Sequence, residues 1–177
     1  MKDEELLIQK AKKGEREAFG TLYDHYMPNI YRFIFFKIGT KHEAEDLTHQ
    51  VFSQAWENME RYEPRGFPLS SWLYRIASNT VIDYYRTFKN NLQIENIPEE
   101  TFAHDPSFEK DFDDRLSIER IRKALKTLES DQQNVIIMKF VDQLSNKEIA
   151  KALEKTEGAI RVIQHRALKQ LKNLLNG

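Results

Sequence analysis

The chain has 177 residues, with 27 Lys and Arg against 28 Asp and Glu, and it has no cysteine. That length suits one medium domain or two small ones. The lack of cysteine excludes a disulfide scaffold, a thiolate zinc site and a cysteine nucleophile. Six Gly and five Pro argue against disorder and against a turn-rich β fold. The apolar runs are too short to cross a membrane and residues 3–5 are acidic, unlike a secretory signal, so we expect a cytoplasmic protein.

The near-neutral total hides an uneven distribution of charge. Residues 1–88 carry a net charge of −1, residues 89–115 carry −5, and residues 116–177 carry +5. A neutral block, an acidic connector and a basic block predict two domains joined by a linker, with the basic domain close to a polyanion. A solvated helical surface is also charged, so the basic excess by itself leaves that simpler interpretation open.

Helical periodicity begins in the N-terminal part of the chain. Apolar side chains recur every three or four residues over 19–34, and Pro28 within that run predicts a break or a first turn. A second helix is predicted over 41–59. It begins with a capping-box pattern, in which Thr40 is followed three residues later by Glu43.

The pattern stops over residues 63–68, which predict a loop, and a third helix is expected over 70–88. Two prolines and scattered acids between 89 and 115 favour a flexible acidic linker. Further helices follow, two of them opened by capping-box patterns that start at Ser130 and Ser145. The predicted fold is all-α, with two small helical domains at 1–88 and 116–177.

The last two predicted helices have the layout of a helix-turn-helix. A short helix over 145–153 and a turn over 154–157 precede a long helix that begins near Gly158. At 3.6 residues per turn, one side of the long helix is apolar: Ile160, Ile163, Ala167, Leu171 and Leu174. The opposite side is largely basic: Arg161, Val162, His165, Arg166, Lys169 and Lys172. Such a face fits a DNA major groove, although an ordinary helical hairpin with a solvated face has the same pattern.

The helix over 70–88 has a second unusual face. Its inner stripe is apolar, whereas Arg75, Asn79, Ile82 and Arg86 line the outer side, with Trp72 nearby. Arginines interleaved with aromatic rings suit single-stranded nucleic acid, because the cations meet the backbone and the rings stack on bases. The alternative is that the aromatic residues belong to the core and the arginines are merely solvated.

A third polar face lies on the helix over 41–59, where Glu45, Asp46, His49 and Gln50 precede Trp56. One turn separates the carboxylates from His49, which is compatible with a metal site, but no other histidine motif supplies matching ligands. We therefore expect no metal, no cofactor and no catalytic residue. A protein-docking surface with an aromatic anchor is a further interpretation.

Three blocks of this sequence, in order, resemble a known family. Residues 46–52 with Trp56 resemble the polymerase-binding helix of bacterial sigma-70-type factors. Residues 72–79 resemble the promoter-melting helix of their extracytoplasmic-function (ECF) subgroup. Residues 144–150, 158–161 and 165–167 resemble the C-terminal helix-turn-helix of that subgroup.

The resemblance implies a protein that is not an enzyme. Such a protein binds the clamp and flap regions of core RNA polymerase, directs it to promoters and helps to melt the duplex. It implies polymerase contacts at Asp46, His49, Gln50, Phe52 and Trp56. It implies minus-ten DNA contacts at Tyr62, Trp72, Arg75, Asn79 and Arg86, and minus-thirty-five contacts at Arg161, Val162, His165, Arg166 and Lys169. In this interpretation the acidic linker threads through the polymerase, and an anti-sigma factor is a further expected partner.

Some positions depart from the family pattern. His49 and Gln50 stand where Gln and Glu are usual, and Val162 stands where a small polar residue is frequent. The promoter sequence is therefore not predictable by analogy. Two alternatives stay open: an autonomous helix-turn-helix regulator, which should bind duplex DNA tightly as a dimer, and a metal-dependent helical enzyme. No segment is left over for dimerisation, so we expect a monomer when the protein is free.

Overall fold

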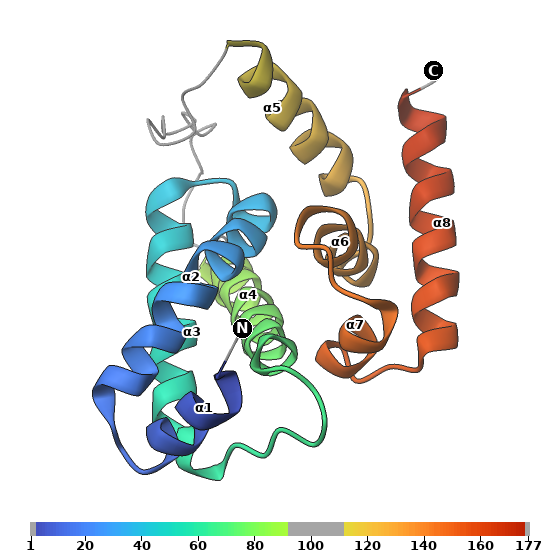
Figure 1. Cartoon of the computed structure of the whole chain (residues 1–177). Coiled ribbons are helices and arrows are strands. Elements are labelled where there is room, and N and C mark those ends of the chain that lie inside the picture. Colours follow the sequence, from blue (N-terminus) through green and yellow to red (C-terminus); the bar gives the residue numbers. More distant parts are fainter. Residues whose placement is uncertain (1–2, 92–111, 176–177) are drawn as a thin grey trace.

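The computed structural model describes residues 3–91 and 112–175, and over these residues the chain is helical without any strand, which confirms the all-α prediction. The N-terminal helices are α1 (Glu4–Lys12), α2 (Arg16–Ile38), α3 (Lys41–Glu57), a 3-10 turn η1 (Met59–Arg61) and α4 (Leu69–Asn91). The C-terminal elements are α5 (Phe112–Lys126), α6 (Ser130–Ile136), a π-helical turn η3 (Ile137–Val141), α7 (Asn146–Ala152) and α8 (Glu157–Leu175) (Figure 1).

The N-terminal core lies between α2, α3 and α4. Phe33 and Ile34 of α2, Val51 of α3 and Ala77 of α4 are all buried, and α1 packs across the start of α2. Burial of these apolar side chains stabilises the bundle, since removing a side chain the size of Phe33, Ile34 or Val51 from water contributes roughly 1.5–3 kcal/mol. No helix among residues 3–91 and 112–175 is long and apolar enough to cross a membrane.

The expectations about helix ends and breaks in this half need correction. Pro28 lies inside α2, which continues to Ile38 without a break. Tyr26 and Ile30 on either side of it are buried, so core packing on both turns outweighs the missing hydrogen bond. Thr40 is the N-cap residue of α3, but its hydroxyl contacts the Glu43 side chain and caps no backbone N–H. The predicted capping box is therefore wrong there.

The C-terminal helices enclose a second set of buried side chains: Leu125, Val135, Ile137, Met138, Ile149, Ile160 and Ala167. The Ser145 capping box is confirmed, because Glu148 N donates to Ser145 Oγ at 3.2 Å and Ser145 N donates to Glu148 Oε2 at 2.7 Å. The other predicted box is shifted by one residue. Its N-cap is Glu129 rather than Ser130, and Glu129 N donates to Gln132 Oε1 at 3.1 Å.

The two halves lie side by side. In Figure 1 the N-terminal helices form one group, α6 and α7 face that group, and α8 lies on the far side of the C-terminal group. Helix α7 packs against α4, and α2 packs against α5 and η3. The predicted linker over 89–115 lies for the most part outside the described residues, although α4 and α5 extend into its two ends.

Candidate nucleic-acid interface

Helix α4 presents the two faces that its periodicity predicts. Leu73 and Ala77 are buried, and Thr80 is buried as well. Arg75, Asn79, Ile82 and Arg86 are exposed on the opposite side. Ile82 is 49% exposed, so an apolar side chain stands among polar neighbours on an accessible face. Such a face offers both apolar and charged contacts to a binding partner.

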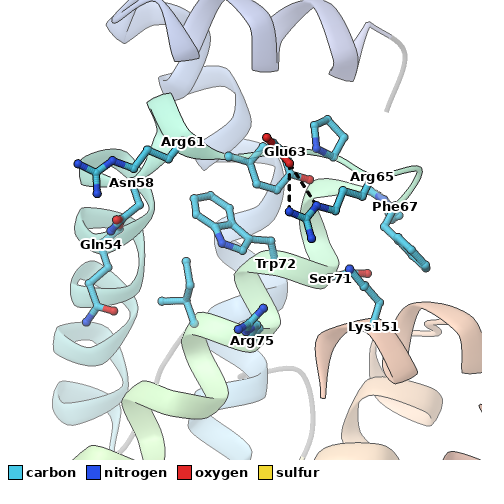
Figure 2. Close-up of a pocket in the computed structure, with 14 residues that line it drawn as sticks. Gln54, Asn58, Arg61, Glu63, Arg65, Phe67, Ser71, Trp72, Arg75 and Lys151 are labelled. Atoms are coloured by element: carbon cyan, nitrogen blue, oxygen red, sulfur yellow. Dashed lines mark hydrogen bonds and ion pairs between the residues drawn. The ribbon is translucent and has the colours of Figure 1, made fainter. Parts of the chain in front are cut away.

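A hollow of about 480 Å³ opens beside the first turns of α4. Trp72 and Tyr62 form an aromatic pair in its wall, with ring centroids 4.6 Å apart. Cations stand around them: Arg61, Arg65, Arg75 and Lys151. Figure 2 shows these side chains around Trp72, with Lys151 reaching in from α7 and an ion pair joining Arg65 to Glu63 at 3.1 Å. Aromatic faces ringed by cations are the chemistry that unstacked bases and their phosphates require.

The loop between η1 and α4 shapes this hollow. Arg65 and Gly66 have φ angles of 47° and 76°, a left-handed conformation that glycine adopts without strain. Phe67 N closes the turn by donating to Pro64 O at 2.9 Å. The loop folds back on itself and brings Phe67 to the rim.

Helix α1 holds the loop in place. Glu4 Oε1 accepts a hydrogen bond from Leu69 N at 2.8 Å, at the start of α4, and Glu4 Oε2 accepts one from the Tyr26 hydroxyl at 2.7 Å. Lys12 Nζ donates to Tyr62 O at 2.7 Å. Burial, together with the Glu4 carboxylate, raises the pKa of Tyr62 to about 12. Tyr62 is only 6% exposed, so it supports the partly exposed Trp72 ring from the core side of the hollow.

The predicted polymerase-binding face lies on α3, on a different surface. Asp46, His49 and Gln50 are exposed, and His42 Nε2 lies 3.8 Å from Asp46. Phe52 is 4% exposed and packs edge-on against Tyr23. The exposed face of α3 therefore consists of the polar residues, and Phe52 supports them from the core.

Trp56, the other aromatic residue predicted to bind polymerase, is half-buried against Phe19, with ring centroids 5.0 Å apart. It lies at the edge of the α3 surface, one side covered and the other accessible. Among residues 3–91 and 112–175 no group of three or more His, Asp and Glu side chains could hold a metal ion.

Helices α7 and α8 form the predicted helix-turn-helix. Thr156 Oγ1 caps α8 by accepting from Ala159 N at 3.1 Å, and Glu154 in the turn has a φ of 53°. The predicted outer side of α8 is exposed: Arg161, Val162, His165, Arg166, Lys169 and Lys172. Ile160 and Ala167 are buried on the inner side. Leu174 is 49% exposed, so the prediction that it belongs to the inner face is wrong; the covered stripe ends before the last turn.

The predicted residues thus fall on three surfaces. Tyr62, Trp72 and Arg75 come together in one hollow, whereas Asn79 and Arg86 continue along α4 beyond it. Sequence reasoning missed three residues of the wall: Gln54 of α3, Asn58 directly after α3, and Lys151 from the other half of the chain. Gln54 and Asn58 lie four residues apart on one helix face, a spacing that could have indicated them. No sequence feature near Lys151 indicates that this residue lies at the hollow.

Family comparisons agree with this division of surfaces. Residues 22–90 match the model of sigma-70 region 2, and residues 118–171 match that of sigma-70 region 4. The chain is 30% identical to the ECF RNA polymerase sigma factor SigW of Bacillus subtilis over 178 residues, which are 95% of this chain and 94% of that protein.

The chain belongs to the ECF RNA polymerase sigma factors.

A second relative is the ECF sigma factor BldN of Streptomyces coelicolor, which is 33% identical over 96% of this chain and 64% of BldN, so the chain spans less than two thirds of that relative. Among solved structures, CnrH in complex with the cytosolic domain of CnrY matches with a TM-score of 0.76 and 24% identity, over 98% of this chain and 97% of CnrH. The sigma factor RpoE of Bartonella quintana, solved with the anti-sigma factor NepR, matches with a TM-score of 0.74 and 24% identity, over 89% and 96%. This sigma factor therefore shares their fold, and its family directs RNA polymerase and is not enzymatic.

Proposed function

We propose that the hollow beside α4 receives a base of the minus-ten element after it leaves the DNA stack. The observation that carries this proposal is the Tyr62–Trp72 ring pair, 4.6 Å apart, within a ring of cations. Unstacking a base costs a few kcal/mol, which a fitted pocket and aromatic stacking offset. Asn79 and Arg86, exposed further along α4, bind the neighbouring nucleotides of the same strand.

The α8 face binds a different part of the promoter, the duplex of the minus-thirty-five element. An exposed helix whose first turns carry Arg161, Val162 and His165 has the shape and chemistry that a major groove accepts. Arg161 bonds a guanine edge and Val162 contacts a thymine methyl. Arg166 and Lys169 lie further along the helix and bind phosphates.

The α3 surface docks on the clamp of core RNA polymerase through Asp46, His49 and Gln50, which are exposed together on one helix. Trp56 at its edge supplies an aromatic anchor, and Phe52 keeps the helix seated on the bundle. The C-terminal half contacts the polymerase flap. The protein acts in the cytoplasm with polymerase as a monomer, carries out no catalytic step, and is held in check by an anti-sigma factor.

Run-off transcription with core polymerase and a library of promoter fragments tests this assignment. We expect specific initiation with the wild-type protein and loss of initiation with Asn79→Ala or Arg161→Ala. Gln9→Ala and Arg120→Ala, at exposed positions of α1 and α5, are matched controls that should keep activity. No initiation, together with tight duplex binding in the absence of polymerase, would instead indicate an autonomous helix-turn-helix regulator.

A further inference from the structure

Helix α1 touches both ends of the loop that shapes the hollow, although it contributes nothing to the wall. Among the residues that the structure describes, those lining the hollow include none from α1. The match to sigma-70 region 2 begins at residue 22, so α1 also lies outside that family model. Its first residue, Glu4, and its last, Lys12, nevertheless reach the loop over 62–69, and Figure 1 shows α1 beside the chain that leads into α4.

The spacing within α1 explains how one short helix reaches two places. Glu4, Ile8 and Lys12 recur every four residues and therefore follow one side of the helix. Ile8 is 3% exposed and Ala11 is 2% exposed, so apolar burial fixes the middle of α1 on the bundle. The two charged ends then extend from a seated helix toward opposite ends of the loop.

Glu4 caps the start of α4 from another helix. Its Oε1 accepts a hydrogen bond at 2.8 Å from the N–H of Leu69, the first residue of α4. The first N–H groups of a helix have no partner within that helix, and a carboxylate there is favoured by the helix dipole. The preceding residue is Pro68, which has no side-chain acceptor. Glu4 thus supplies the cap that the local sequence lacks.

Tyr26 of α2 fixes the orientation of this carboxylate. Its hydroxyl donates to Glu4 Oε2 at 2.7 Å. Burial, together with the hydrogen bond to Glu4, raises the pKa of Tyr26, so the hydroxyl keeps its proton and remains a donor. Both oxygens of Glu4 therefore have a partner, one on α2 and one on α4.

Lys12 holds the other end of the loop. Its Nζ donates to Tyr62 O at 2.7 Å, a short hydrogen bond of the charge-assisted kind, which is stronger than a bond between neutral groups. Tyr62 directly follows η1, and its backbone is extended. The ammonium group therefore fixes the backbone at the point where the loop leaves η1.

The two contacts converge on the ring pair of the hollow. Lys12 fixes the backbone that carries the Tyr62 ring, and Glu4 fixes the first turn of α4, which carries Trp72. The ring centroids are 4.6 Å apart and the ring planes are tilted by 33°. A shift at either end of the loop would move one ring against the other. Binding sites of this kind depend on side chains whose positions are fixed by their supporting contacts.

We propose that α1 is a positioning element for promoter melting, in which Glu4 and Lys12 set the loop over 62–69 and, through it, the Tyr62–Trp72 pair. The proposal rests on the function proposed above for the hollow. Neither side chain touches DNA or polymerase in this role. Contacts that only stabilised the fold would, on removal, weaken every activity alike, whereas loss of a positioning contact weakens capture of the minus-ten strand alone.

Four substitutions test the role of α1. Glu4→Ala removes both carboxylate contacts, whereas Glu4→Gln keeps an oxygen for Leu69 N. Lys12→Met removes the ammonium group and keeps most of the stem, whereas Lys12→Arg keeps a cation. Glu5→Ala and Lys13→Met are the matched controls, because they make the same changes of charge at neighbouring exposed positions.

Fluorine NMR reports the ring pair without DNA or polymerase. The chain has two tryptophans, so 5-fluorotryptophan gives one signal from Trp72 and one from Trp56, which packs against Phe19 away from the loop. We expect the Trp72 signal to shift or broaden in Glu4→Ala and Lys12→Met and to stay in place in both controls. The Trp56 signal should not change in any variant. A Trp72 signal identical to the wild type in both variants would overturn the proposal.

Binding by the polymerase complex then tests the functional consequence. The probe is a fluorescently labelled single strand with the minus-ten sequence of a promoter that the run-off experiment selects, and anisotropy measures its affinity. We expect affinity to fall about tenfold in Glu4→Ala and Lys12→Met, as loss of one charge-assisted hydrogen bond can produce. Glu4→Gln and Lys12→Arg should recover most of it. Affinity for core polymerase and for the minus-thirty-five duplex should not change.

The alternative outcomes are distinct. An equal loss of polymerase binding and strand binding would assign Glu4 and Lys12 a merely structural role and refute the proposal. Should Glu4→Ala not fold, Lys12→Met gives the same test, because it leaves the cap of α4 intact. If the wild-type complex selects no promoter, the proposed function of the hollow fails, and the fluorine signals still decide whether α1 positions the rings.

Discussion

The two halves of this sigma factor meet nucleic acid with surfaces of opposite shape. The α4 side is concave, a hollow of about 480 Å³ with the rings of Tyr62 and Trp72 in its wall. The α8 side is a convex helix face with exposed Arg161, Val162 and His165. A concave aromatic pocket accepts a single base, and a convex basic helix fits an intact groove. One all-helical chain thus carries both chemistries, because a loop between helices shapes the first surface and a helix face forms the second.

The largest expected effect comes from Trp72→Ala, which should impair the α4 hollow and leave the α8 face unaffected. Trp72→Ala removes half of the ring pair, and base–aromatic stacking is worth about 1–3 kcal/mol. We therefore expect promoter opening by the polymerase complex to fall by roughly 10- to 100-fold, while duplex binding at the minus-thirty-five element stays unchanged. Permanganate reactivity of unpaired thymines measures the opening. Trp72→Phe, which keeps a ring, should retain most of the activity; equal loss with both variants would contradict the stacking role.

A second substitution acts where α2 of the N-terminal half packs against α5 of the C-terminal half. Gly39, the residue after α2, has a φ of 98°, and a Cβ there would lie 1.5 Å from Arg122 Nη2 of α5. Gly39→Ala would incur a left-handed backbone cost of about 1–2 kcal/mol and displace Arg122 from its place over the Phe35 ring.

We expect Gly39→Ala to lower the melting temperature and to lengthen the distance between the two halves, measured by pulsed electron resonance between spin labels at Glu57→Cys and Lys126→Cys, both exposed. Gly14→Ala is the control, because its φ is 87° but nothing lies within 4 Å of the added Cβ. If both variants gave the same distance distribution as the wild type, the Arg122 contact would not contribute to the packing of the two halves.

The packing of the two halves against each other should depend on pH through Lys37, which contacts Ser130 and Asn134 of the C-terminal half. Burial lowers the pKa of this amine to about 8, although Asp131 opposes the shift; Ser130, Asn134 and the Phe33 ring also face it. If the two halves separated, its pKa would return to the ordinary value near 10.5. The packed form binds fewer protons above pH 8 than the separated form, so rising pH favours packing of the two halves.

Between pH 7 and pH 9 the ratio of packed to separated protein should rise about tenfold. Distance measurements between the same two spin labels follow this ratio. Lys37→Met keeps the volume of the side chain but has no proton to lose, so its packed population should not change over that range. A wild-type ratio that stays constant with pH would show that Lys37 is solvated in solution.

The smallest effect concerns the helix-turn-helix alone. Ser145→Ala removes the hydroxyl that accepts from Glu148 N at 3.2 Å. Loss of such a cap costs about 1 kcal/mol, and thermal unfolding should show it in the C-terminal half. Ser53→Ala, at an exposed position of α3, is the control. Duplex affinity should weaken only slightly, since α8 keeps its own cap from Thr156.

Regular periodicity made the helix faces predictable. The outer sides of α4 and α8 and the Ser145 capping box depend on spacings of three and four residues, which the sequence shows directly. Pro28 was misjudged because its local effect is opposed by packing around Tyr26 and Ile30. The Glu129 cap was missed by one residue, since Glu129 and Ser130 both stand before the same helix.

Contacts between residues far apart in the sequence could not be predicted from helical periodicity. Glu4 bonds Leu69 and Tyr26, Lys12 bonds the backbone of Tyr62, and Lys151 reaches the hollow from the other half. These positions look like ordinary charged helix residues, because the spacing of a helix face says nothing about which distant element it meets. The contacts between the two halves, such as Arg32 with Asp142 and Asn134 with Ser78, also join residues far apart in the sequence, and only the three-dimensional structure shows them.

The most direct test of the α4 hollow is the fluorescence of 2-aminopurine placed at a minus-ten position of the non-template strand, with core polymerase and this sigma factor. A base that leaves the stack fluoresces more strongly. We expect a rise with the wild type, no rise with Trp72→Ala or Asn79→Ala, and a normal rise with Gln9→Ala. Initiation with an equal rise for Trp72→Ala and the wild type would contradict the assignment of the hollow to an unstacked base.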